Sequence, residues 1–397
     1  MPILNQFGET SYIHWIFIII LFILLPLIQP RIYLAQALWR LEQSSTTLEE
    51  MTESGKKIVI KKISKKPRKE LQNAINNFLE FFVITPVSLD PFGIMKKLEH
   101  LMILEEKRFK YFVKSIAPHL DVESQWDLIM GLSGAITLNQ ITKIVRHLTE
   151  LVRKTKNWQL GMLYTMQLSL IESLAKALLK GTEALTNGWP IGDSIGNLVG
   201  AHLIGNAKTK EIEEDTLLAR RKIKRKDVLI IKSKGPGGRL GKLGKAVEKL
   251  VKREKIAKII TVDAAAKLEG EKTGNIAEGV GVAVGGIGVD RAYIENIAVQ
   301  KGIPLDSIVI KMSQEEAIQP MKAEILSASG KALRAVEDSI ARTKERGKII
   351  VVGVGNSSGI GNNKKDAEEA EKKVKKILQI LKARKEEKRK FSWLIGE

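Results

Sequence analysis

The stretch that decides the fold runs from residue 348 to residue 363 and reads KIIVVGVGNSSGIGNN. Its first residues are mostly apolar and β-branched, which predicts a buried strand at Lys348–Val352. Glycine, Asn and Ser follow in a loop, and the charged run that begins at Lys364 has the composition of a helix. A strand, a glycine-rich loop and a helix in this order form the unit from which parallel sheets are built.

The same unit recurs through residues 181–363, where Gly becomes frequent and short β-branched runs alternate with helical ones. Strands that are apolar throughout are typical of a parallel sheet covered on both faces. The sequence therefore predicts a three-layer α/β domain with a mostly parallel sheet, whose functional loops lie beyond the carboxyl ends of the strands. We expect further strands at Val228–Ile231, Lys258–Val262, Val280–Val284 and Ser307–Ile310, and helices at Leu240–Arg253, Asp290–Lys301, Gln314–Arg346 and Lys364–Lys388.

The region before this domain is predicted to be helical. Apolar residues recur there at three- and four-residue spacing, for example at Ile141, Ile144, Val145 and Leu148. We expect about five helices between residues 70 and 180. The predicted domains are a membrane anchor at 1–40, a basic juxtamembrane linker at 41–69, a helical domain at 70–180, the glycine-rich α/β domain at 181–363, and a C-terminal basic helix and tail at 364–397.

The first forty residues predict an N-terminal transmembrane helix. The run Ile13–Ile28, IHWIFIIILFILLPLI, carries no Asp, Glu, Lys or Arg, and apolar residues after Arg31 extend it toward the roughly 20 residues that a bilayer requires. The alternative is a buried core helix. Basic residues follow the run, including eight between Lys56 and Lys69, so we expect a single-pass protein of the cell membrane with the bulk of the chain in the cytoplasm. The basic cluster would attract anionic lipid headgroups, although it is also compatible with a solvated charge run.

Composition limits the partners. The formal charge of +20 favours anionic partners, whereas nucleic acid is disfavoured because aromatic residues make up only 5% of the chain and do not alternate with basic ones. The absence of Cys excludes disulfides, thiolate metal sites and cysteine nucleophiles. The helical domain is expected to contact a protein partner or a second copy of the chain.

Two glycine-rich loops are candidates for anion binding. The loop KGPGGRLGKLGK at Lys234–Lys245 joins a strand to a helix, and its backbone amides and side-chain cations are suited to a phosphate group. It is neither a Walker A motif nor a dinucleotide fingerprint, and a tight turn before a basic helix is the alternative. The candidate ligand-binding residues are Gly235, Gly237, Gly238, Arg239 and Lys242 in this loop, and Gly353, Gly355, Asn356 and Ser357 in the loop quoted first.

Two acidic motifs carry a resemblance. The sequence GDSIG at Gly192–Gly196 is similar to the acidic turn that opens a helix in the hydrogenase-maturation endopeptidases and the related spore-protease-like proteins. The sequence VDA at Val262–Ala264 resembles their second acidic strand end. The resemblance implies that Asp193 and Asp263 bind a metal. The alternative is that Asp193 caps a helix and Asp263 ends a strand.

The order of these motifs departs from that family. A turn resembling the one that normally precedes the first acid occurs here at Val351–Asn356, as though the sheet were circularly permuted, and no His occupies the place of a third metal ligand. A permuted sheet predicts that Lys348–Val352 is central and lies beside Lys258–Val262, or one strand away from it. Asp193, Asp263 and Gly353–Asn356 would then surround one pocket.

The whole chain also resembles an archaeal membrane-associated family of unknown function. Our leading hypothesis is a membrane-anchored, cytoplasm-facing protein whose α/β domain binds a phosphate-bearing small ligand. The alternatives are a metal-dependent hydrolase or peptidase that uses Asp193 and Asp263, and a membrane assembly module without a ligand. The cofactor would accordingly be a nucleotide or a divalent metal, and the sequence does not identify catalytic residues.

Overall fold

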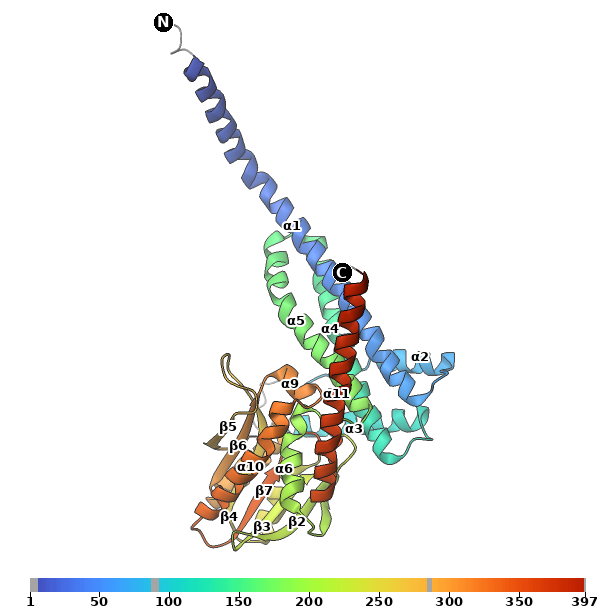
Figure 1. Cartoon of the computed structure of the whole chain (residues 1–397), viewed down its shortest axis with the longest axis vertical. Coiled ribbons are helices and arrows are strands. Elements are labelled where there is room, and N and C mark those ends of the chain that lie inside the picture. Colours follow the sequence, from blue (N-terminus) through green and yellow to red (C-terminus); the bar gives the residue numbers. More distant parts are fainter. Residues whose placement is uncertain (1–5, 87–92, 284–287, 396–397) are drawn as a thin grey trace. The chain divides into compact units, whose positions relative to one another are not determined.

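A computed structural model describes residues 6–86, 93–283 and 288–395 of the chain (Figure 1). The chain divides into two compact units, which are described separately. The first unit comprises residues 1–53 and 138–176, and the second comprises residues 54–137 and 177–397. Parts of three long helices make up the first unit, and a helical segment and the α/β domain make up the second.

The first unit is built from α1 (Gln6–Ile63), α4 (Val122–Thr155) and α5 (Trp158–Thr186). Hydroxyl groups bridge α1 and α4 in its interior, where Ser45 Oγ lies 3.2 Å from Thr149 Oγ1. Helix α1 continues without a break to Ile63, so much of the segment predicted as a basic linker is helical.

The apolar run of α1 lies on the surface of the described chain. Every side chain from Trp15 to Leu24 is exposed. Two stretches of α1, His14–Leu24 and Ile28–Ile63, together meet the length and hydropathy required of a membrane span, with an angle of 49° between them. Among the described helices α4 meets the same criterion alone, but half of its apolar window is buried within the protein, as in a soluble core helix.

The second unit contains a helical segment with its own core. Helices α2 (Lys69–Phe78) and α3 (Ile94–Ile116) pack beside the first part of α4. The ring of Phe78 stacks on Phe112 with centroids 3.8 Å apart and meets Phe109 edge to face at 5.1 Å. The prediction that this region is helical is therefore confirmed.

The α/β domain contains one mixed sheet of seven strands in the order β1-β2-β3-β7-β4-β6-β5. The four strands β3, β7, β4 and β6 are parallel, whereas β1, β2 and β5 pair antiparallel at the two edges. Strand β7 lies between β3 and β4, as the permuted order predicted. The strands are β1 (Thr209–Glu213), β2 (Thr216–Ile223), β3 (Lys226–Ser233), β4 (Ile256–Ala266), β5 (Ile276–Val280), β6 (Leu305–Met312) and β7 (Lys348–Gly353).

The prediction of a mostly parallel sheet was wrong at its edges. The β1–β2 hairpin is rich in Lys, Arg and Glu, so it lacks the apolar run that marks a buried strand. The strand predicted at Val280–Val284 ends outside the described residues, and its described part after Val280 is not a strand; the chain forms β5 at Ile276–Val280 instead. The predicted helix Gln314–Arg346 is divided at Pro320, because proline cannot continue a helix.

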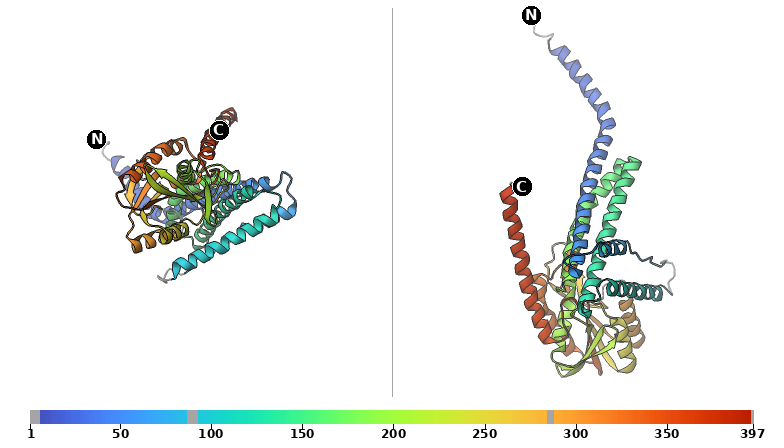
Figure 2. Two further views of the ribbon diagram at one scale, coloured as in Figure 1. Left: turned by 90° about the horizontal axis from the view of Figure 1, so that it is seen from below. Right: turned by 90° about the vertical axis from the view of Figure 1, so that its right-hand side faces the viewer.

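Helices cover both faces of the sheet (Figure 2). Helices α6 (Ile195–Ile204), α10 (Ala323–Arg342) and α11 (Lys364–Ile395) enclose the core on one face, while α7 (Leu243–Arg253) and α8 (Val289–Lys301) pack on the other. The short helix α9 spans Gln314–Ile318. This arrangement confirms a three-layer α/β domain.

Gly196 sets the distance between α6 and the sheet. A Cβ atom at this position would lie 2.2 Å from the carbonyl oxygen of Val354 and 2.4 Å from that of Val262. The first turn of α6 therefore rests directly on the carboxyl ends of β7 and β4. The close approach brings Asp193, in the 3-10 turn Gly192–Ser194, to this edge of the sheet.

We predict that Gly196→Ala destabilises the protein strongly, by more than about 3 kcal/mol, because both clashing atoms belong to the backbone and cannot rotate away. Gly330→Ala in α10 is the matched control, since no atom lies within 4 Å of the position that its methyl group would take, and alanine favours a helix by about 1 kcal/mol. Chemical denaturation of the purified protein measures both changes, and equal stability of the two variants would contradict the prediction.

Candidate functional site

A cavity of about 350 Å³ lies at the carboxyl ends of the parallel strands, within the second unit. Its floor includes Asp263 of β4, Asp193, and Val354 and Gly355 beyond β7. The loop after β3 contributes Gly238–Leu243, and α3 and α4 close the other side with apolar side chains that include Phe109 and Trp126. The volume is in the range of cavities that bind small molecules.

The two acids singled out by the sequence both line this cavity. Asp193 Oδ2 accepts a hydrogen bond of 2.8 Å from the backbone N–H of Asn356, and burial raises the pKa of the Asp193 carboxyl above its ordinary value. Asp263 is only 3% exposed, and its Oδ1 accepts from the N–H of Ala264. Asp263 lies in β4 and Asp193 in the 3-10 turn before α6. The close packing of Gly196 on the carbonyls of Val354 and Val262 brings both acids to one cavity, as the permuted order predicted.

The loop predicted to bind phosphate already has acidic partners within the protein. The side chain of Arg239 is 2% exposed, and its guanidinium donates to both carboxylate oxygens of Glu123 at 2.6 and 3.0 Å. The backbone N–H groups of Gly237 and Gly238 donate to Glu123 and Asp127 of α4. These side chains occupy the donors that a phosphate group would require.

Asp215 is a second acidic partner of Arg239. The Nε atom of Arg239 lies 3.0 Å from Asp215 Oδ1, but the geometry is not that of a hydrogen bond. Lys242 pairs with Glu106 at 2.9 Å. Both cationic side chains of the predicted anion site therefore neutralise carboxylates of this protein.

The loop after β7 braces the loop after β3. Ser357 donates its backbone N–H to the carbonyl of Arg239 at 2.9 Å and its hydroxyl to the carbonyl of Gly237 at 2.7 Å. The N–H of Gly235 donates to the side chain of Asn362. Gly353 packs against the carbonyl of Gly196, where a side chain would not fit. The residues predicted to bind a ligand in these two loops therefore hold the loops together through hydrogen bonds and close packing.

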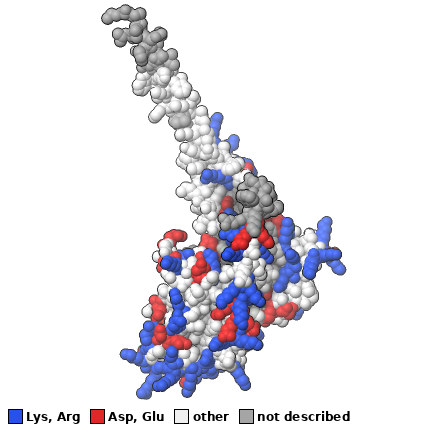
Figure 3. Space-filling view, viewed as in Figure 1, with Lys and Arg blue, Asp and Glu red and all other residues white. Residues whose placement is uncertain are grey.

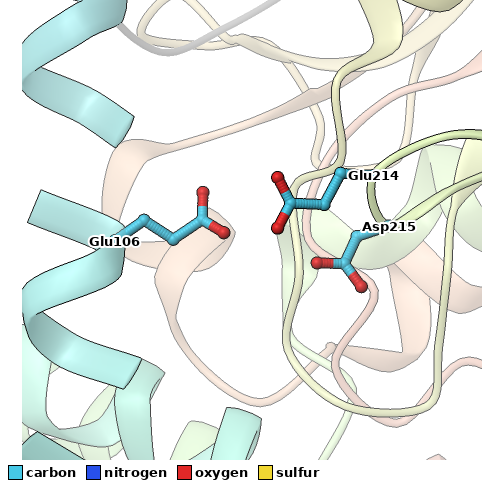
Figure 4. A group of neighbouring side chains, drawn as sticks. All are labelled: Glu106, Glu214 and Asp215. Atoms are coloured by element: carbon cyan, nitrogen blue, oxygen red, sulfur yellow. The ribbon is translucent and has the colours of Figure 1, made fainter. Parts of the chain in front are cut away.

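Glu106, Glu214 and Asp215 form an acidic group at one side of the cavity (Figure 4). One carboxylate oxygen of each lies within 4.8 Å of the others. Lys110 lies between two of them, at 2.6 Å from Glu106 and 2.8 Å from Glu214. Burial alone would raise the pKa of Glu106, but hydrogen bonds from Lys110 and Lys242 hold it below its ordinary value. This group is an internal ion-pair network.

The remaining lining of the cavity is electronegative. Among the described lining residues, the basic ones are Arg239 and Lys242, and both are paired with acids. Outside the ion-pair network, burial raises the pKa of Glu105 and of Asp290, whose carboxylate accepts from the N–H of Gly244 at 2.6 Å. The acidic lining residues are Glu105, Glu106, Asp193, Glu214, Asp215, Asp263 and Asp290. Sequence reasoning missed Glu105 and Glu106 of α3 and Glu214 and Asp215 of the hairpin turn, because charged residues at such positions normally face solvent.

This cavity contrasts with the outer surface of the α/β domain. Lys and Arg gather over the end of the domain where β2, β3 and β4 are labelled (Figures 1 and 3). The β2–β3 hairpin contributes Lys224 and Arg225 from its turn, and Lys222 and Lys226 from the strand ends beside it. The excess positive charge of the chain is therefore not a property of the cavity.

Asp127 is the second acid beneath the glycine loop. Burial raises its pKa to about 7, opposed by the positive charges of Lys62 and Lys373 and by the hydrogen bond from Gly238. Its carboxyl oxygen lies 2.4 Å from the position of a Cβ at Gly188, which has a left-handed φ of 59°. Burial also lowers the pKa of Lys373, so the surroundings disfavour the charged form of both groups.

We predict that Arg239→Ala lowers the free energy of unfolding by about 3 kcal/mol, because it removes the cation from two partly buried carboxylates. Arg220→Ala is the control, since Arg220 also pairs with a glutamate, Glu254, but its own side chain is 54% exposed. Denaturant titration should show a change below about 1 kcal/mol for the control. Similar losses in the two variants would show that Arg239 does not have this structural role.

We predict that Asp127→Asn removes part of the pH dependence of stability. A carboxyl whose folded pKa is raised from 3.8 to about 7 favours folding fully below pH 4, and this contribution is lost as the pH rises through 7. Between pH 4 and 7 the free energy of unfolding of the wild-type protein should therefore fall by up to roughly 4 kcal/mol more than that of the variant. Denaturation at pH 4 to 8 measures the difference, with the exposed substitution Asp227→Asn as control. A constant difference across this range would contradict the raised pKa.

Two sequence models of one protein family match the chain. The model described as the N-terminal domain of the protein of unknown function DUF1512 matches residues 15–188, and that of the C-terminal domain of DUF1512 matches residues 191–361. No curated protein and no solved structure matches the chain. The comparisons thus add no support to the resemblance to the hydrogenase-maturation endopeptidases. The boundary between the two matches follows the end of α5 at Thr186.

Proposed function

The chain belongs to the DUF1512 family, whose function is unknown, and we propose that it is a membrane-anchored protein that binds a divalent cation in the acidic cavity of its α/β domain. The observation that carries the proposal is the position of Asp193 and Asp263 in one cavity whose basic residues are already paired. Carboxylate oxygens are the preferred ligands of Mg²⁺, Mn²⁺ and Ca²⁺, and bound water would complete the coordination.

Electrostatics favours a cation over an anion here. Burial disfavours the charged form of a carboxylate, and it raises the pKa of Asp193 and of Asp290. A bound cation would stabilise the charged forms of these groups. A phosphate group, our hypothesis from the sequence, would instead have to displace Glu123 from Arg239 and Glu106 from Lys242.

The second candidate function is metal-dependent hydrolysis. A cation held by Asp263 of β4 and by Asp193 of the turn before α6 would lower the pKa of a bound water. The cavity has an apolar wall that includes Met102, Phe109 and Trp126, beside which an organic substrate would fit. This arrangement favours hydrolysis of a partly apolar substrate over simple metal storage.

The membrane anchor rests on the exposed run of α1. Ten consecutive exposed residues from Trp15 to Leu24, mostly apolar, would expose far more apolar surface to water than isolated surface hydrophobics do. Insertion into a bilayer removes this cost. The basic residues that follow, beginning with Arg31, support a cytoplasmic location of the remainder of the chain.

We predict that the detergent-purified protein binds Mn²⁺ or Mg²⁺ at one site, and that Asp193→Asn and Asp263→Asn each weaken binding at least tenfold. The loss of one charged ligand corresponds to roughly 1.5–3 kcal/mol. Affinity should also rise with pH, because the carboxyl with the raised pKa must lose its proton first. Calorimetric titration at two pH values measures both effects.

Glu214→Gln is the matched control, because this acid lines the same cavity, has an exposed side chain and forms an ion pair with Lys110. It should weaken cation binding less than threefold. An equal effect of all three variants would indicate diffuse charge and contradict a defined site. Binding of ATP or phosphate without any cation would favour the anionic ligand, and the absence of both would favour a ligand-free assembly module.

A further inference from the structure

The first unit presents a hairpin tip next to the proposed anchor. Helices α4 and α5 are joined by a tight turn at Lys156 and Asn157, and this tip lies beside α1. The ring centroids of Trp158 and Tyr33 are 5.7 Å apart. Gly161 packs so closely on α1 that a Cβ atom there would lie 2.9 Å from the Cβ of Ala37. The start of α5 is therefore level with residues 33–37 of α1.

The contacts between α1 and α4 fix the same level independently. These helices are antiparallel, so residue numbers fall along one as they rise along the other, and the contacts end with Glu42 and Arg153, one turn before the tip. A glycine and hydroxyl groups at the contacts allow close packing of the three helices (Figure 2). The pairs are Thr52 with Thr142, Glu49 with Arg146, Ser45 with Thr149, and Glu42 with Arg153.

The tip has the composition of a membrane interface. Trp39 of α1 is 62% exposed, and Trp158 and Tyr33 lie at the same level. Aromatic residues of this kind and basic residues are enriched where a protein leaves the hydrocarbon core. Exposed basic residues surround the tip: Arg31, Arg40, Lys154 and Lys156.

The length of the apolar run places this level at the bilayer surface. The segment from Ile13 to Ile32 has about 20 residues, and at 1.5 Å per residue its path along the bent helix is about 30 Å, close to the thickness of the hydrocarbon core. The next turn of α1 carries Tyr33 and contacts the tip. If α1 spans the membrane, the tip meets lipid headgroups.

We propose that the tip of the α4–α5 hairpin, together with Arg31 and Arg40 of α1, is a second membrane contact that binds anionic lipid headgroups. The inference rests on the proposed anchor. It assigns this contact to Lys154 and Lys156 rather than to the basic cluster at Lys56–Lys69, which begins 23 residues after Tyr33. The contact would hold the first unit against the membrane instead of letting it rotate about a single helix.

The absence of Cys in the chain permits a direct test in the full-length protein. A spin label on Gln159→Cys, exposed in the first turn of α5, reports the tip, and the same label on the exposed position Glu50→Cys reports α1 about 25 Å further along. The protein is reconstituted into phosphatidylcholine vesicles with and without phosphatidylglycerol, both doped with a nickel-chelating lipid. We expect strong relaxation of the label at position 159 by the headgroup nickel, and little at position 50.

Lys154→Gln plus Lys156→Gln should lower the docked population in phosphatidylglycerol vesicles roughly twentyfold, since each basic residue near an anionic surface contributes about a fivefold factor. Lys176→Gln, on an exposed lysine of α5 away from the tip, is the control and should have no effect. Equal relaxation at positions 159 and 50 would overturn the proposal, as would insensitivity to both lipid charge and the double substitution. Dipolar broadening between two labels at position 159 would instead show that a second copy occupies this surface.

Alkaline carbonate extraction distinguishes failure of the anchor from failure of the tip contact. Release of the protein from vesicles would reject the anchor itself. Retention of the protein without relaxation at position 159 would leave the anchor in place and reject only the contact of the tip with headgroups.

Discussion

Arg239 is buried between Glu123 of α4 and Asp215 of the β1–β2 turn, and the arrangement of the second unit depends on this interaction. A guanidinium that has lost its water must be matched by charge and by hydrogen bonds, and a bidentate carboxylate is the most complete partner available. Because the two acids come from a helix and from an edge hairpin, one side chain joins three parts of the sequence. The glycine loop that carries Arg239 is thereby held over the carboxyl ends of the strands.

The same interaction explains why a loop with the appearance of a phosphate site is part of the scaffold. Glycines 237 and 238 allow the backbone to approach an anion closely, but the anions that approach are the side chains of Glu123 and Asp127. The basic residues next to them are paired in the same way. The rest of the lining is rich in carboxylates, most of them half-buried, and the proposed cation would stabilise their charged forms.

A positively charged protein with an electronegative cavity has a consistent physical basis. Charges on the outer surface act through water and are screened within about a nanometre at physiological ionic strength. Charges that line a cavity with low-dielectric walls act at short range and determine the local field. The net charge of +20 is therefore compatible with the proposed contact of the chain with anionic lipid, while the local acids set the charge that a ligand in the cavity would meet.

Patterns in the sequence were sufficient to predict the three-layer α/β domain and the helical region before it, and the permuted order of the motifs placed Lys348–Val352 beside Lys258–Val262 or one strand away. Apolar strands such as Val228–Ile231 and the spacing of apolar residues in helices encode burial directly, and burial is a local requirement. The meeting of Asp193 and Asp263 in one cavity was also accessible, since parallel strands bring their carboxyl ends to one edge. The edge strands β1 and β2 were missed because their charged residues hide the apolar pattern of a strand. The break at Pro320 was missed because the residues on both sides of it have a helical pattern.

The role of Arg239 and Lys242 follows from contacts that form only when the chain folds. Their sequence context is the same whether their charge faces a ligand or an acid of the same protein, and the deciding partners lie more than 100 residues away in α3 and α4. The level of the α4–α5 tip along α1 was likewise fixed by packing at Gly161 and Ala37. Pairing over such distances depends on the geometry of the folded chain, which short patterns in the sequence do not contain.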